Sequence, residues 1–96
     1  MAEKTLEELT LIIKDRILRM PSDSYVSELY KKGEVKIANK LGEEAVETIS
    51  AFLTNEKKEV VEESADLLFH LLILLEFRGL NILDVIKVLK KRMKDD

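Results

Sequence analysis

Four carboxylates in the middle of the chain recur as two pairs with helical spacing. Glu44 and Glu47 form the first pair, and Glu63 and Asp66 form the second. Side chains three residues apart are neighbours on a helix, with Cβ atoms about 5–6 Å apart. Each pair could therefore bind one cation, although a solvated acidic face is the more usual role of such spacing.

A turn near Asn55 would bring the two pairs to the same level. In an antiparallel hairpin, positions equally far from the turn lie opposite each other, so Glu47 faces Glu63 and Glu44 faces Asp66. A rise of about 1.5 Å per residue puts all four roughly 12–16 Å from the turn. The numbering thus predicts a four-carboxylate cluster between two helices.

The cluster would need a positive partner, because no Lys or Arg occurs between residues 43 and 56. Converging carboxylates repel one another and have raised pKa values, and a bound divalent metal removes that problem. Oxygen ligands favour hard cations, so the pattern predicts Mg²⁺, with Mn²⁺ as a substitute. A di-iron site would need Glu-x-x-His pairs, and Leu67 stands three residues before the single histidine, His70.

Two lysines precede the first acidic pair on the same helical face. Lys40 lies one turn before Glu44, and Lys36 lies one turn earlier. They could form a cationic strip that meets phosphates, or they could be ordinary solvent-exposed lysines. His70 lies within the apolar sequence LLFHLLILL, which favours a buried, hydrogen-bonded histidine over a catalytic one.

The length of 96 residues indicates one domain, residues 1–96. Because the chain has no cysteine, it can form neither a disulfide nor a thiolate metal site. A net charge of -3 with interspersed signs argues against a nucleic-acid binder. The amphipathic start, MAEKTLEEL, is not a signal peptide, and the longest apolar run is too short for a membrane span. We therefore expect a cytoplasmic protein with no membrane partner. The segment from Leu67 to Phe77 is apolar almost all round, which favours a homodimer.

The apolar periodicity predicts helices throughout and no strand. The expected helices cover residues 5–20, 25–32, 34–53 and 56–78, and a last one opens at 81. We expect helix caps at Thr5, Ser24, Thr54 or Asn55, and Asn81. The helix from residue 34 should bury a stripe of apolar residues, namely Val35, Ala38, Leu41, Ala45, Ile49 and Phe52 or Leu53.

Several motifs occur in the order found in one known family. They are Ser24-Tyr25, Lys36-x-x-x-Lys40-x-Gly-Glu-Glu-Ala-x-Glu47, Glu63-x-x-Asp66-Leu-Leu-x-His-Leu-Leu and Arg78-Gly79-Leu. With them the chain resembles the phosphoribosyl-ATP pyrophosphatases of histidine biosynthesis, which belong to the all-α nucleoside triphosphate pyrophosphatases together with MazG-like proteins and dimeric dUTPases. Val26 stands where that family commonly has Thr.

The resemblance implies Mg²⁺-dependent attack of water on the α–β phosphoanhydride of phosphoribosyl-ATP, giving phosphoribosyl-AMP and pyrophosphate. It also implies an all-α fold with an antiparallel helical hairpin core, flanking helices and a four-helix-bundle-like arrangement completed by dimerisation. A separate phosphoribosyl-AMP cyclohydrolase is a candidate partner. Two other functions stay open: a house-cleaning nucleoside triphosphate pyrophosphatase, and a non-enzymatic helical interaction module.

The acidic pairs, the neighbouring lysines and the family resemblance together predict roles for individual residues. We expect the four paired carboxylates to hold the metal and Glu43 to orient the water or complete the metal shell. Lys40 and Lys36 would neutralise the departing pyrophosphate. Ser24 and Tyr25 would contact the phosphoribosyl or triphosphate end of the substrate.

Overall fold

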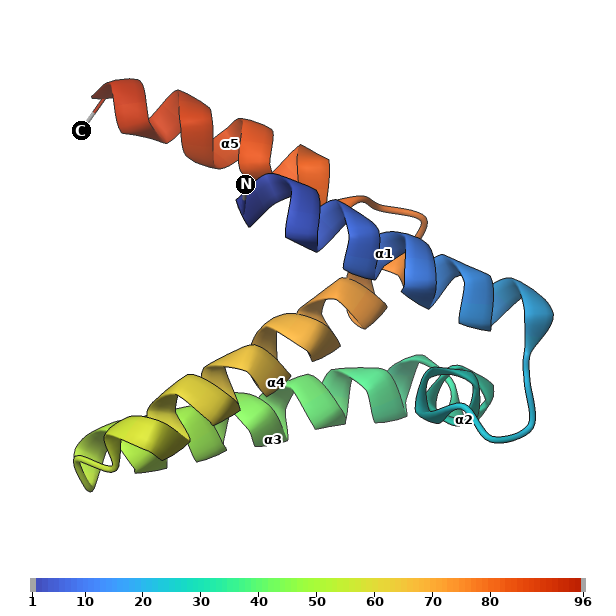
Figure 1. Ribbon diagram of the computed structural model, residues 1–96, viewed down its shortest axis with the longest axis horizontal. Helices are drawn as coiled ribbons and strands as arrows, with labels where there is room; N and C mark the ends of the chain where they lie inside the picture. Colours follow the sequence, from blue (N-terminus) through green and yellow to red (C-terminus); the bar gives the residue numbers. More distant parts are fainter. Residues whose placement is uncertain (1, 96) are drawn as a thin grey trace.

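The computed structural model describes residues 2–95, and this part of the chain is built from five helices without a strand (Figure 1). The helices are α1 (Ala2–Arg19), α2 (Tyr25–Lys32), α3 (Glu34–Leu53), α4 (Lys57–Phe77) and α5 (Ile82–Asp95). The all-α prediction is therefore confirmed. None of these helices combines the length and the hydropathy needed to cross a membrane.

Helices α3 and α4 form the predicted antiparallel hairpin, which lies below α1 and α5 in the view of Figure 1. The chain reverses at Asn55, whose φ of 60° is in the left-handed region that Asn tolerates. The amide of Glu56 donates to the Ala51 carbonyl over 3.1 Å. The expected side-chain cap was wrong: Glu56 is the N-cap residue without a capping bond, and the Thr54 hydroxyl donates back to the carbonyl of Ser50.

Helix α1 begins at Ala2, so Thr5 lies inside the helix and the predicted cap at Thr5 was wrong. The far end is as expected, because the residue before a proline is pushed out of the helical region. Met20, which precedes Pro21, has φ of 49°. The chain then turns towards α2.

Helix α2 begins after the predicted cap Ser24 and ends at Lys32, as predicted. The Ser24 hydroxyl accepts a hydrogen bond from the Ser27 amide over 3.2 Å, and Gly33, with φ of 94°, ends the helix. Sequence reasoning missed a further link. The Ser27 hydroxyl is fully buried and donates to the Arg16 carbonyl at 3.0 Å, which ties α2 to the last turn of α1.

The turn between α4 and α5 follows two standard capping patterns. The Leu80 amide donates to the Leu75 carbonyl and the Gly79 amide to that of Glu76, which is a Schellman motif with Gly79 at φ of 74°. Asn81 then caps α5, because its side chain accepts from the Leu83 amide at 2.9 Å. The Asp84 carboxylate accepts from the Asn81 amide, so the predicted capping box is confirmed.

The core lies where α1 crosses the C-terminal half of α4, and α5 runs back beside α1 (Figure 1). Its buried members are Ile13, Val26, Leu29, Ile37, Leu72, Ile73, Leu75 and Ile82. An ion pair of 3.2 Å between Lys90 and Glu3 joins α5 to the start of α1. The half of the hairpin nearest the turn contributes little to this core.

The apolar stripe predicted for α3 does not face the core. Val35 is 70% exposed and Ile49 is 57% exposed, whereas the buried residues of α3 are Ile37, Glu44 and Ala51. The face that carries Glu44 is turned towards α4, which leaves the large apolar side chains outside. Periodicity identified an apolar face correctly but placed it on the wrong side of this chain.

The buried bond between α2 and α1 gives a stability prediction. Replacing Ser27 with Ala should lower the free energy of unfolding by about 1 kcal/mol, because an intramolecular hydrogen bond is lost. Urea denaturation measures the change. The matched control is Ser50→Ala on the exposed surface of α3, which should stay within about 0.5 kcal/mol of wild type. Equal effects of the two substitutions would contradict a structural role for the Ser27 bond.

Candidate metal and phosphate site

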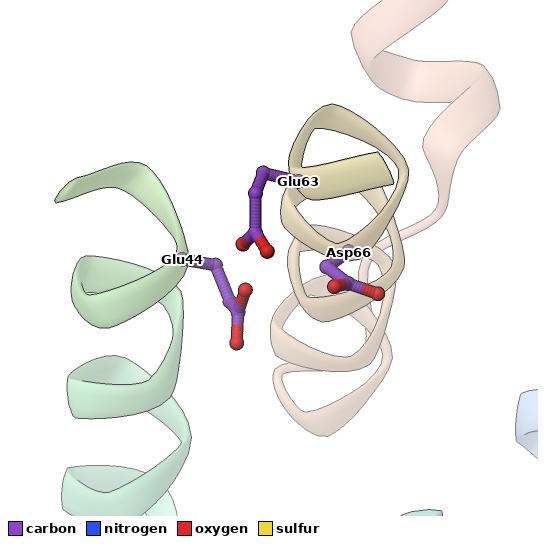
Figure 2. A group of neighbouring side chains, drawn as sticks. All are labelled: Glu44, Glu63 and Asp66. Carbon is purple, nitrogen blue, oxygen red and sulfur yellow. The ribbon is translucent and has the colours of Figure 1, made fainter. Parts of the chain in front are cut away.

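Three of the four predicted carboxylates meet between α3 and α4. Glu44 extends from α3 towards Glu63 and Asp66 on α4, as Figure 2 shows. One oxygen from each of the three side chains lies within 4.8 Å of the others. Glu44 is buried, Glu63 is half-buried and Asp66 is exposed, so the group opens to solvent on one side.

The cluster contains acceptor atoms without donors. Oε2 of Glu44 and Oε2 of Glu63 are buried and have no hydrogen-bond partner within residues 2–95. A buried carboxylate oxygen is costly unless a hydrogen bond or a cation compensates for its lost hydration. Because all three side chains offer oxygen ligands, the arrangement fits a hard divalent cation.

Glu47 lies at the edge of this group rather than within it. A hydrogen bond with Glu47, together with burial and the neighbouring negative charges, raises the pKa of Glu63 to about 7. The pKa of Glu44 is raised as well, first by burial and then by the charge of Glu47. Without a cation, the Glu63 carboxyl group therefore holds a proton up to a pH of about 7.

Lys40 connects the acidic group to a second feature. Its Nζ lies 3.4 Å from Oε2 of Glu43 and 3.9 Å from Oε1 of Glu44. Glu43 itself is exposed and does not reach the group of three. Within residues 2–95, Lys40 is the cation that pairs with this acidic group.

A cavity of about 240 Å³ adjoins Lys40 and opens between α2 and α3. Its lining is rich in lysine and comprises Tyr25, Glu28, Leu29, Lys32, Lys36, Lys40 and Glu43. Both lysines expected to meet phosphates are thus present. Sequence reasoning missed Lys32, although its place in the last turn of the short helix, close to Lys36, was a usable signal. We call this space the lysine cavity.

A larger cavity of about 500 Å³ lies on the other side of Tyr25, between α1, α2 and α4. Ser24, Arg16, Arg19 and Phe69 are among the residues that line it. The Ser24 oxygen already accepts a bond as the helix cap. Val26 also borders this space, but it is only 5% exposed and belongs to the core.

His70 is buried, as its apolar surroundings predicted, and both ring nitrogens have partners. Nδ1 lies 2.7 Å from the carbonyl oxygen of Asp66, and Nε2 lies 2.7 Å from the hydroxyl of Tyr25. The histidine thus connects the helix turn that carries Asp66 to the wall shared by the two cavities.

Comparison with known proteins adds an independent finding. A family model described as phosphoribosyl-ATP pyrophosphohydrolase matches residues 6–93. A phosphoribosyl-ATP pyrophosphatase of Metallosphaera sedula is 47% identical over 89 residues, which cover 93% of this chain and 96% of the relative. One from Pyrobaculum aerophilum is 48% identical over 94 residues, 98% of this chain and 100% of the relative.

A third relative of the same name, from Zymomonas mobilis, is 46% identical over 92 residues, which cover 96% of this chain and 86% of its own length. The match therefore includes both acidic pairs, the lysine cavity and the turn at Ser24. On this evidence, the chain belongs to the phosphoribosyl-ATP pyrophosphohydrolase family.

Proposed function

We propose that this protein hydrolyses phosphoribosyl-ATP to phosphoribosyl-AMP and pyrophosphate. The observation that carries the proposal is the convergence of Glu44, Glu63 and Asp66 beside a cavity lined by lysines. Cation-binding oxygens and cationic side chains next to each other are what a triphosphate requires. Family membership supports phosphoribosyl-ATP as the substrate.

The cation we propose is Mg²⁺, which Mn²⁺ could replace. Glu44, Glu63 and Asp66 would hold it, and Glu47 would join them once Glu63 has lost its proton. When bound, such an ion supplies charge stabilisation at the phosphoryl group and activation of water. The unpartnered oxygens of Glu44 and Glu63 support this assignment.

The remaining residues act on the phosphates and the water. Water would attack the α-phosphorus and lose a proton to the solvent, the bond from that phosphorus to the bridging oxygen would break, and pyrophosphate would leave. Lys40, Lys36 and Lys32 would neutralise the charge on the departing group from the lysine cavity. Glu43, which faces the same cavity and pairs with Lys40, would orient the water.

A second copy of the chain would cover apolar side chains that are exposed on the α3–α4 hairpin. Several large apolar side chains are exposed on the hairpin: Val46, Ile49, Phe52, Leu53 and Val61. Each is at least 57% exposed, which is unfavourable for a stable monomer. We propose that the hairpins of two copies pack together through these residues. The cytoplasmic location and an association with a cyclohydrolase stay predictions.

The first prediction concerns turnover and the carboxylates. Purified protein with Mg²⁺ should release pyrophosphate from phosphoribosyl-ATP much faster than from ordinary nucleoside triphosphates. Glu63→Gln should reduce kcat at least about 100-fold, because charge stabilisation of the transition state is lost. The matched control, Glu62→Gln, changes an exposed neighbour on the same helix and should keep near wild-type activity.

Three outcomes would contradict the proposal in different ways. Preference for ordinary or modified triphosphates would indicate a house-cleaning pyrophosphatase. Absence of both turnover and Mg²⁺ binding would indicate a non-enzymatic helical module. Near wild-type turnover by Glu63→Gln would refute the role of the carboxylates.

The second prediction concerns pH. Because the pKa of Glu63 is about 7 without a cation, protons compete with the cation below that pH. The Kd for Mn²⁺, measured by calorimetry, should be about tenfold weaker at pH 6 than at pH 8, since one proton must be released. Glu47→Gln removes the partner of Glu63 and should flatten this dependence. An unchanged Kd across this range in the wild type would contradict the raised pKa of Glu63.

A rise in pH should strengthen cation binding but should lower the stability of the metal-free protein. A folded-state pKa of about 7 lies above the ordinary value of 4.5 for Glu63. The metal-free protein should therefore lose stability as pH rises from about 4.5 to 7, and Glu63→Gln should lose less over this range. Thermal unfolding in the presence of a chelator measures both, and parallel curves would contradict the assignment.

The third prediction concerns assembly. Sedimentation should give twice the chain mass of 11.1 kDa. Ile49→Glu places a charge on the exposed hairpin face and should shift the protein to monomer. Met93→Glu, a control at a more exposed site on α5, should leave the dimer intact. A wild-type monomer at micromolar concentration would refute the proposed packing.

A further inference from the structure

His70 is the one histidine of the chain, and it sits in an otherwise apolar segment of α4. Its side chain spans from α4 to α2 through two hydrogen bonds of 2.7 Å each. The Tyr25 and His70 rings also pack edge to face, with centroids 5.6 Å apart. A buried polar side chain that is satisfied on both sides holds its neighbours in defined positions.

The direction of each hydrogen bond follows from the chemistry of the partners. The Asp66 carbonyl oxygen can only accept, so Nδ1 of His70 must carry the hydrogen. In the neutral ring Nε2 then has no hydrogen and accepts. The Tyr25 hydroxyl must therefore donate its proton to Nε2.

This direction determines what Tyr25 can offer to a ligand. Its hydroxyl proton is committed to His70, so the phenol oxygen presents only lone pairs to its surroundings. Tyr25 is 46% exposed and borders both the lysine cavity and the larger cavity beside α1. A lone-pair acceptor at that place would accept from a hydroxyl or ammonium donor and would not donate to a phosphate oxygen.

We propose that His70 is a positioning residue, which fixes the Tyr25 hydroxyl as a hydrogen-bond acceptor towards the bound nucleotide. The donor it suits is a ribose hydroxyl of the substrate, with phosphates left to the lysines. The proposal rests on the proposed function, because it assigns Tyr25 a place in that same site. It narrows the expected role of Tyr25, a contact to the phosphoribosyl or the triphosphate end, to a contact with the sugar.

Nitrogen-15 NMR of the imidazole tests the hydrogen-bond direction without any substrate. The single histidine makes the two ring signals unambiguous. At pH 8 the hydrogen should be on Nδ1, and Tyr25→Phe should shift the Nε2 signal while leaving Nδ1 in place. Tyr30→Phe is the matched control, because Tyr30 packs on Phe77 away from His70 and should move neither signal. A hydrogen on Nε2, or an Nε2 signal unaffected by Tyr25→Phe, would overturn the proposal.

Steady-state kinetics tests the positioning role. His70→Leu should raise KM for phosphoribosyl-ATP by about 3- to 10-fold, the value of one hydrogen bond, with kcat changed less than about threefold. Tyr25→Phe should raise KM by a similar factor, and the double variant should be no worse than either single one. His70→Gln keeps an acceptor for the phenol and should recover most of the loss.

Two kinetic results would contradict a positioning role for His70. Independent, multiplying KM effects in the double variant would overturn the coupling, and so would a His70→Gln variant as impaired as His70→Leu. If His70→Leu fails to fold, Tyr25→Phe and His70→Gln still decide the matter. The NMR result does not depend on the substrate, so a failure of this proposal is distinguishable from an inactive wild-type protein.

Discussion

Electrostatic repulsion across the α3–α4 hairpin is the constraint on which the rest of this structure depends. Glu44, Glu63 and Asp66 bring three carboxylate oxygens within 4.8 Å of one another, with two buried oxygens unpartnered in the described part of the chain. Such an arrangement lowers the free energy of unfolding. Proteins accept this cost where the arrangement serves a function. A proton on Glu63 relieves the repulsion without a ligand, and a cation would relieve it when bound.

The elements around the hairpin bring other side chains to this place. The Ser27 bond to α1 and the Ser24 cap hold the short helix α2 over α3, which brings Lys32 of α2 into one cavity with Lys36 and Lys40 of α3. His70 joins α2 to α4 through Tyr25. Helix α3 therefore contributes to both sides of the site, through Lys36 and Lys40 and through Glu44, whereas α2 adds Lys32 and α4 adds the other two carboxylates.

Much of this could be predicted from residue type and spacing. Gly79, Asn81, Ser24 and Pro21 act locally, and each lies beside a helix end, close to the boundaries predicted from the sequence. The meeting of the acidic pairs followed from their equal distances to Asn55. Long-range features were harder to predict: periodicity does not say which face of α3 meets α4, so Ile49 was expected in the core. It also does not show that Glu47 stands aside, or that Lys32 joins the lysines of α3.

The most direct test of the central claim is a crystal structure with Mn²⁺ and anomalous diffraction at the manganese edge. We predict a strong anomalous peak among the carboxylates of Glu44, Glu63 and Asp66, and its loss in a Glu63→Gln crystal. Protein that releases pyrophosphate with Mn²⁺ but shows no peak at this position would contradict the claim that these three residues form the cation site.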